Sequence, residues 1–279
     1  MPLVTSKELL LAAQKDKYAI AAFNVENMEM AQAVISAAEE ACAPVIVQTT
    51  SGTLKYAPPA IFAGIVAHLA QNVKVPVAMH LDHGSSLELA KACIAAGYTS
   101  LMIDGSLLPF SGNVALTKSV VQIAYNLPVE AELGTVGGKE DGHDAKPQYT
   151  DPKEAVEFVR ETDISSFAVA IGTAHGVYKG VPKLNIDLLD KIRQAVAIPL
   201  VLHGTSGVPH DQVRACIRRG ICKVNYATEL RIAFSDGVKS VLAKRPDVFD
   251  PKQYLAAGRE AVKSRVLELI RLCGCDGKG

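Results

Sequence analysis

Several features that would assign this chain to a specialised class of protein are missing from its sequence. Lys+Arg and Asp+Glu balance at 29 each, so there is no overall basic field for nucleic acid and any anion site must be local. The first residues lack the apolar segment and cleavage site of a signal peptide, and no apolar run reaches the roughly 18 residues of a membrane span. We therefore expect a cytoplasmic protein that binds neither nucleic acid nor membrane.

The sequence also has no clear disulfide framework. For a chain without an export signal, its six cysteines are expected to be buried thiols and not disulfide partners. Cys273 and Cys275 form one close pair near the C-terminus. Without a second pair they are only a weak indication of a metal or redox site.

What the sequence does contain is a regular alternation of apolar, β-rich runs with helical patterns. Hydrophobic residues make up 49% of the chain and charged residues 21%, which is enough for a sizeable core. Most of the runs are apolar on both faces, as is typical of parallel strands covered by helices. The eight runs span residues 19–25, 44–50, 75–83, 100–106, 128–134, 166–176, 198–207 and 221–228.

Eight such units in about 250 residues match the size of a (β/α)₈ barrel, the TIM barrel of the α/β class. The alternative, a doubly wound open sheet, would carry a Gly-x-Gly-x-x-Gly fingerprint after its first strand, and the segment FNVENMEM has none. Helical patterns precede the first strand and follow Arg245, and no linker-like segment divides the chain. The sequence predicts a single domain, 1–279, with extra N-terminal and C-terminal helices.

Polar residues gather where the predicted strands end. In a TIM barrel the C-terminal strand ends form one rim, and this rim carries the active site. Packing alone does not readily bring such residues to the same end of six strands. The residues concerned are His80, Asp82, His83, Asp104, Glu130, Glu132, Thr173, His175, His203, Thr205, Ser206, Asn225 and Thr228.

Three of these histidines, His83, His175 and His203, are each followed by glycine at a strand end. Any one of them taken alone is more often a core histidine than a ligand. Together on one rim they predict a three-histidine site with an open fourth position, which suits catalytic zinc. His80 competes with His83, but regular strand alternation sends the two to opposite faces. We expect only His83 to point into the site.

Glycine-rich strand ends followed by helices predict an anion site. Segments 204–207 and 225–228 lead into helices, and Gly176 follows His175. Backbone N–H groups at helix starts bind phosphate, often after strands seven and eight of a barrel, although ordinary turns and N-caps are the alternative. Asp82 offers a base at the rim. Glu140 lies in a long glycine-rich loop, and its composition alone favours a solvated loop residue.

Five motifs at the strand ends and in the long loop are specific in combination. They are HLDHG (80–84), EAELG (130–134) with GGKED (137–141), GTAHG (172–176), LHG (202–204) and VNYAT (224–228). Together they resemble the class II, zinc-dependent ketose-bisphosphate aldolases along the whole chain. The resemblance implies a lyase that cleaves a ketose 1,6-bisphosphate to dihydroxyacetone phosphate and glyceraldehyde 3-phosphate, with Zn²⁺ stabilising an enediolate. It also implies a Na⁺ or K⁺ ion near the phosphate and a homodimer or homotetramer.

The resemblance also implies a role for individual residues. Asp82 would handle the proton of the C4 hydroxyl, Glu140 would move a proton at the enediolate carbon, and Asn225 would hold the enediolate. The implied metal ligands are His83, His175, His203 and, in some states, Glu132. The implied substrate-binding residues are Asn24, Thr50, Ser51, Gly176, Gly204, Thr205, Ser206, Asn225, Tyr226, Ala227, Thr228 and Lys252.

The motifs divide between two epimeric substrates. GTAHG and ATEL (227–230) look more like tagatose-bisphosphate aldolases, whereas Gly84 looks more like the fructose enzymes, because tagatose enzymes often have a second histidine there. Tyr226 replaces a usual small aliphatic residue. Lys252 replaces the usual arginine at the second phosphate, which a neighbouring subunit commonly supplies. We expect D-tagatose 1,6-bisphosphate as substrate, with fructose 1,6-bisphosphate or another phosphorylated ketose as alternatives.

Two other functions stay open at this point. A Schiff-base aldolase would use Lys223 in the last strand, although a salt-bridged lysine is the better expectation there. A non-catalytic sugar-phosphate-binding subunit would keep the anion site and lose the metal or the base. The sequence has Asp82, the three histidines and Glu140, which argues against that subunit.

Overall fold

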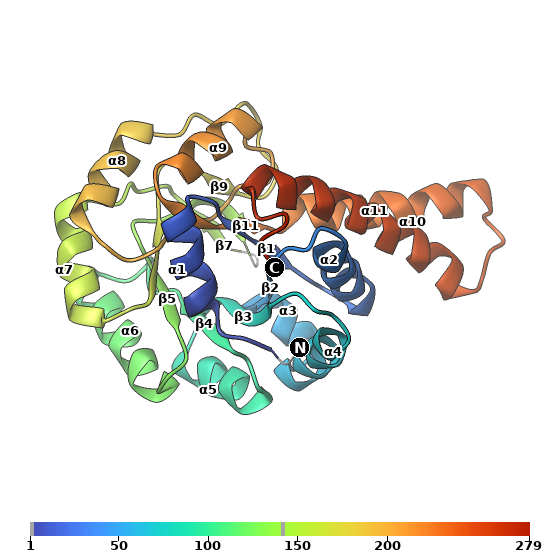
Figure 1. The fold of residues 1–279 in the computed structure, drawn as a ribbon, viewed down its shortest axis with the longest axis horizontal. Coiled ribbons are helices and arrows are strands. Elements are labelled where there is room, and N and C mark those ends of the chain that lie inside the picture. Colours follow the sequence, from blue (N-terminus) through green and yellow to red (C-terminus); the bar gives the residue numbers. More distant parts are fainter. Residues whose placement is uncertain (1–2, 141–142) are drawn as a thin grey trace.

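A computed structural model of the chain describes residues 3–140 and 143–279, without the side chains of residues 139–145. Its centre is a closed barrel of parallel strands in the order β1-β11-β10-β8-β5-β4-β3-β2, enclosed by helices (Figure 1). This confirms the predicted TIM barrel. The strands are β1 (Ile20–Asn24), β2 (Val45–Thr50), β3 (Val77–Gly84), β4 (Ser100–Ile103), β5 (Val129–Leu133), β8 (Ser166–Val169), β10 (Leu200–Leu202) and β11 (Ile221–Tyr226).

The predicted extra helices are present at both ends of the chain. The first helix closes the N-terminal end of the barrel, where Ser6 Oγ lies 2.7 Å from Ser100 Oγ. The last two form a hairpin that extends away from the barrel (Figure 1). The helices are α1 (Ser6–Asp16), α2 (Met28–Glu40), α3 (Ser51–Tyr56), α4 (Pro59–Gln71), α5 (Leu87–Ala96), α6 (Phe110–Ala124), α7 (Pro152–Thr162), α8 (Ile186–Ala195), α9 (His210–Arg218), α10 (Thr228–Lys244) and α11 (Pro251–Cys273).

Side-chain caps set several of the helix starts. Asn27 accepts a hydrogen bond from Met30 N at the start of α2, and Ser86 accepts one from Leu89 N at the start of α5. Asp151 caps α7, with proline in the first turn, where its missing N–H costs nothing. These caps fix the residues at which the three helices begin, near the strand ends at the rim of the barrel.

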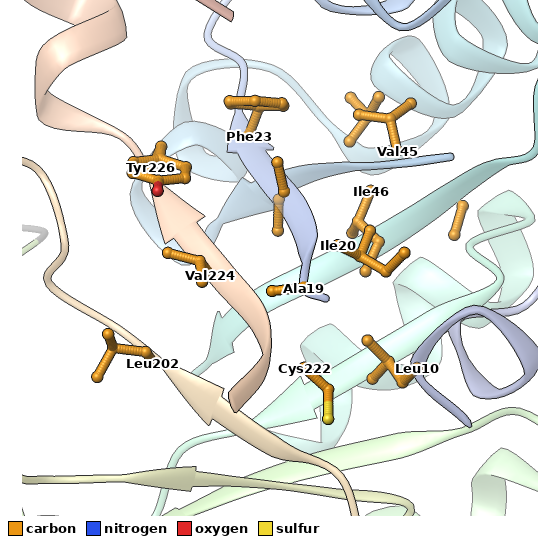
Figure 2. Packing of buried hydrophobic residues seen from close by; sticks show 14 of the residues in the cluster. Leu10, Ala19, Ile20, Phe23, Val45, Ile46, Leu202, Cys222, Val224 and Tyr226 are labelled. Atoms are coloured by element: carbon orange, nitrogen blue, oxygen red, sulfur yellow. The ribbon is translucent and has the colours of Figure 1, made fainter. Parts of the chain in front are cut away.

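The outer and inner faces of the barrel differ in polarity. Outward side chains such as Phe23, Val45 and Leu202 pack in the layer between strands and helices, as Figure 2 shows. Among the described residues, Met102, Ala168 and Val201 form a small apolar cluster that is separate from this layer. Side chains alternate between the two faces of a strand. Many of the other side chains that point into the barrel are polar.

The long loop after β5 forms a second, three-stranded sheet that the sequence analysis did not predict. Its strands are β6 (Gly137–Glu140), β7 (His143–Ala145) and β9 (Ala174–His175), in the order β7-β6-β9. Gly138 pairs with His175 and has φ +91°, and a Cβ there would lie 2.2 Å from the His175 carbonyl oxygen. Only glycine fits this contact, which ties the loop to the segment carrying His175.

The six cysteines are free, as predicted, and five of them are buried. Cys42 is exposed, so the expectation of a buried thiol is wrong at that position, which lies in a turn just after α2. None of the helices in the described ranges combines the length and apolar character needed to cross a membrane.

Candidate active site

The three histidines predicted as metal ligands come together at the C-terminal rim. His83 lies near the end of β3, His175 ends β9, and His203 directly follows β10. The ring centroid of His83 is 5.0 Å from that of His175 and 4.6 Å from that of His203. One nitrogen from each ring lies within 4.8 Å of the other two. This grouping suits three ligands of a single metal ion.

The end of β3 is irregular, and this corrects the expectation for His80 and His83. His83 has φ +45°, and the pairing of β3 with β4 shifts between Leu81 and Gly84. The irregularity turns His83 into the site beside Asp82, while His80 lies deeper inside the same barrel, near Lys223. Both histidines therefore point inward, because the strict alternation that separates them does not hold at this strand end.

The buried Glu130 and the partly buried Asp104 indicate which nitrogens of the histidines can bind a cation. His83 Nδ1 lies 2.7 Å from Asp104 Oδ2, and His203 Nε2 lies 2.8 Å from Glu130 Oε1. An ionised carboxylate only accepts, so each of these nitrogens carries the proton. The remaining nitrogens, His83 Nε2 and His203 Nδ1, then face each other with lone pairs at 2.8 Å. Two imidazole nitrogens directed to the same place, with His175 beside them, are a donor set that fits a metal ion.

Both carboxylates are held in the ionised form. Burial by itself raises the pKa of Asp104, but its hydrogen bonds with His83 and Ser106 outweigh burial and keep that pKa well below its usual range. Burial likewise acts to raise the pKa of Glu130, and Lys223 and His203 overcome it in the same way. Sequence reasoning noted both acids at strand positions without giving them a role. Period-two alternation, which puts Glu130 and Glu132 on one face, is the signal that could have found Glu130.

Asp82 is held by two amides at the edge of this centre. Asn24 Nδ2 donates to one carboxylate oxygen at 2.8 Å, and Asn225 Nδ2 donates to the other at 3.0 Å. Gln48 in turn donates to Asn24 Oδ1 at 2.8 Å. The buried Asn225 Oδ1 has no hydrogen-bond partner within the described ranges. The carboxylate therefore has a fixed orientation, and a neighbouring acceptor is available to a substrate hydroxyl.

The predicted anion site forms one cavity beside Asp82. Gly204 has φ +62°, and a Cβ there would lie 2.8 Å from the Ala174 carbonyl. Tyr178 braces the same place, since its hydroxyl accepts from Ala174 N and donates to the Gly204 carbonyl. The cavity is lined by Asn24, Asp82, Ala174, His175, Gly176, Gly204, Thr205, Ser206, Asn225, Ala227, Thr228 and Arg231.

Arg231 was missed by the sequence analysis. It lies one turn into α10, three residues after Thr228, and binds Glu26 while lining the cavity. Helical spacing from the predicted anion segment could have found it.

A second cavity adjoins the other side of the histidines. Both cavities are lined by His175, and the second one is also lined by His83 and Glu132. Glu132 Oε2 lies 3.5 Å from His203 Nδ1, within reach of the metal position. Leu107 and Leu108 give the far wall an apolar character, and the lining includes the amine-bearing Lys55 from α3, which sequence reasoning did not select.

Four of the predicted residues lie away from these cavities or outside the description. Tyr226 is buried against Phe23 on the outer face of the barrel, with ring centroids 5.8 Å apart (Figure 2). Thr50 accepts a hydrogen bond from Thr53 N at the start of α3, whereas the adjacent Ser51 lines the second cavity. Lys252 is exposed at the start of α11, where it pairs with Asp250. The side chain of Glu140 lies outside the described part of the chain.

Comparisons with known proteins find relatives that match over the full length of the chain. The chain is 46% identical to the D-tagatose-1,6-bisphosphate aldolase subunit GatY of Klebsiella oxytoca, and the match covers all of both chains. The crystal structure of the YdjI aldolase from Escherichia coli K12 superposes with a TM-score of 0.88 at 39% identity, over 99% of each chain. The fructose-bisphosphate aldolase of Campylobacter jejuni gives 0.83 at 25% identity, over 100% of this chain and 97% of that one.

The sequence profile of the class-II fructose-bisphosphate aldolases matches residues 4–278, nearly the whole chain. This chain belongs to the class-II fructose-bisphosphate aldolase family and is a class II ketose-bisphosphate aldolase.

Proposed function

We propose that the chain reversibly cleaves D-tagatose 1,6-bisphosphate to dihydroxyacetone phosphate and glyceraldehyde 3-phosphate, with Zn²⁺ on His83, His175 and His203. The observation that carries the proposal is the group of three histidines between two cavities, with Asp82 at its edge. Full-length identity of 46% to a protein named as a tagatose-bisphosphate aldolase subunit favours this substrate.

The first cavity suits the ketone half of the substrate. Glycine backbone, the hydroxyls of Thr205, Ser206 and Thr228, and the start of α10 offer hydrogen-bond donors to the phosphate on C1. Arg231 adds a positive charge at the same place. A Na⁺ or K⁺ ion beside this phosphate, which the family resemblance implies, would offset part of its negative charge.

Asp82 is the group we assign to the C4 hydroxyl. With each oxygen already accepting from an amide, the carboxylate keeps one orientation and takes the hydroxyl proton as the bond between C3 and C4 breaks. A bound Zn²⁺ supplies a Lewis acid for the negative charge that develops on the ketone fragment. Asn225 Oδ1 is an acceptor for a hydroxyl of that fragment, and Glu140 would move the later proton at carbon.

The second cavity suits the aldehyde half, which ends in the second phosphate. Lys55 supplies a cation from this chain. Lys252 lies far along the helical hairpin, so it could serve that phosphate only from a neighbouring copy in a homodimer or homotetramer (Figure 1). Glu132, at the inner end of the cavity, is close enough to join the metal ligands.

The same contacts bear on an alternative substrate and on an alternative mechanism. Fructose 1,6-bisphosphate differs from the proposed substrate only at the C4 hydroxyl, and Gly84 is a point of likeness to the fructose enzymes. A Schiff-base mechanism would need a neutral, accessible amine, whereas Lys223 is 1% exposed and forms an ion pair of 2.9 Å with Glu130. That pairing disfavours Lys223 as the nucleophile.

The test is release of dihydroxyacetone phosphate from both bisphosphates, measured with the chain alone before EDTA treatment, after it, and after zinc is restored. We expect cleavage that EDTA abolishes and zinc recovers, with the higher kcat/KM on the tagatose epimer. A higher kcat/KM on the fructose epimer would show that fructose 1,6-bisphosphate, and not the tagatose epimer, is the preferred substrate. Activity unaffected by EDTA, together with borohydride trapping of Lys223, would show that the chain uses the Schiff-base mechanism and not the metal-dependent one.

A further inference from the structure

A buried line of charged groups runs beneath the histidine site, and the proposed chemistry does not use it. Glu130 Oε1 lies 2.8 Å from His203 Nε2, and Glu130 Oε2 lies 2.9 Å from Lys223 Nζ. The side chains of His203, Glu130 and Lys223 are at most 2% exposed. Lys223 Nζ also lies 3.4 Å from His80 Nε2, and His80 Nδ1 lies 2.7 Å from Ser100 Oγ.

A buried ion pair of this kind has a high desolvation cost, which suggests that it has a role in the site. Removing two charges from water costs several kcal/mol per ion, and well-packed apolar side chains could fill the same space. Neither Glu130 nor Lys223 lines either cavity. The pair therefore acts on the site only through the residue that it contacts there, which is His203.

We propose that Glu130 and Lys223 are positioning residues that fix the tautomer of His203, so that Nδ1 presents a lone pair to the metal. A lysine ammonium only donates, and Lys223 Nζ donates to both Glu130 oxygens, at 2.9 Å to Oε2 and 3.2 Å to Oε1. The carboxylate is thereby held with Oε1 2.8 Å from His203 Nε2, where it can accept from the ring. His203 must then carry its proton on Nε2. Lys223 in this arrangement is the group that orients the carboxylate and is not a nucleophile.

The neighbouring groups are consistent with this direction of hydrogen bonds. Burial lowers the pKa of His80 to about 3, and Lys223 acts in the same sense, so His80 is neutral and can accept from the lysine. The 2.8 Å contact with Glu130 Oε1 then assigns the Nε2 proton of His203.

The Glu130→Gln variant tests the proposal because an amide has one accepting end and one donating end. Lys223 Nζ lies nearer to the Oε2 position, at 2.9 Å against 3.2 Å for Oε1, so it draws the amide oxygen there and the NH₂ group turns toward His203 Nε2. His203 must then accept at Nε2 and carry its proton on Nδ1, where it blocks the metal. We expect zinc affinity, measured by competition with a chelating dye, to fall roughly 10- to 100-fold.

A double variant separates this effect from simple damage to the barrel. In Glu130→Gln/Lys223→Met the lysine no longer holds the amide oxygen, so the amide can turn that oxygen to His203. Zinc affinity is expected to recover by about tenfold relative to Glu130→Gln alone, within the range that such buried partners govern. Glu157→Gln, on the exposed face of α7, is the matched control. No loss in Glu130→Gln, or no recovery in the double variant, would overturn the proposal.

The wild-type protein offers a second measurement that requires neither folding of a variant nor bound metal. With ¹⁵N-labelled histidine and EDTA present, the His203 ring should give the NMR pattern of an Nε2-protonated tautomer. An Nδ1-protonated ring would contradict the proposal. The inference rests on the metal site of the proposed function, and the two fail differently. A wild-type chain that binds no zinc would contradict the proposed function. Zinc binding together with an Nδ1-protonated His203 in the metal-free protein would contradict only the positioning role.

Discussion

Asp82 and His83 are adjacent in the chain, yet both side chains face the same site, because His83 adopts φ +45° at the end of β3. A regular strand would send one of them to the helices. The irregular end brings a carboxylate held by two amides next to a histidine held by Asp104. The proposed base and a proposed metal ligand thereby share one corner of the rim, and several of the predictions below test the contacts around them.

Asp82→Asn should separate catalysis from metal binding. The amide preserves size and most hydrogen bonds but cannot take a proton, so we expect kcat to fall at least about 100-fold. Zinc affinity should stay near the wild-type value, because Asp82 is not among the three grouped histidines that we propose as ligands. A variant that cleaves substrate as fast as the wild type would show that another group handles the C4 hydroxyl proton.

Gly84→Ala should destabilise the end of β3. A Cβ at this position would lie 2.5 Å from the Met102 carbonyl oxygen, and such overpacking costs about 1–3 kcal/mol of unfolding free energy. Thermal and urea unfolding measure the effect. Gly64→Ala is the control, because nothing lies within 4 Å of its Cβ on α4 and alanine in a helix gains roughly 0.5–1 kcal/mol. Equal stability of the two variants would contradict the structure.

Lys55→Met should affect only substrates that carry a second phosphate. We expect KM for tagatose 1,6-bisphosphate to rise about tenfold, equivalent to one charge-assisted hydrogen bond of about 1.5 kcal/mol. Cleavage of tagatose 1-phosphate should be unchanged, and Lys91→Met on α5 serves as a surface control. If Lys252→Met shows the effect and Lys55→Met does not, the charge comes from a neighbouring copy.

Tyr226→Phe should change stability and not substrate binding. The hydroxyl lies 3.6 Å from Cys273 Sγ in the core, so its loss should cost about 0.5–1.5 kcal/mol. KM should stay constant because the ring packs on Phe23 outside both cavities. A rise in KM would restore the substrate-binding role that the sequence suggested.

The stability contribution of Glu130 should depend on pH in a defined direction. Its folded pKa lies below the ordinary value, because Lys223 and His203 overcome the effect of burial. The contribution is complete above the unfolded pKa of about 4.3 and is lost as pH falls toward the folded value. Urea unfolding in EDTA should therefore show the gap between wild type and Glu130→Gln shrinking below about pH 4. A constant gap would mean that the carboxylate stays paired in both states.

The sequence by itself determined the barrel and the membership of its rim. Eight apolar runs with a helical rhythm predict parallel strands, and polar residues at the run ends predict where chemistry gathers. Asp82, His83, His175 and His203, and most of the anion site, follow from that reasoning together with the motifs. These features are local in sequence, so pattern and spacing are enough to find them.

Only the tertiary structure decided which side chains meet and which do not. The turn at His83, the partners Asp104 and Glu130, and the cavity contacts of Lys55 and Arg231 depend on strands and helices distant in sequence. Tyr226 and Lys252 show the converse, since motif position suggested the site and packing put them elsewhere. The physical reason is that a strand has two faces, and the register and irregularities of the closed barrel select which face each residue shows.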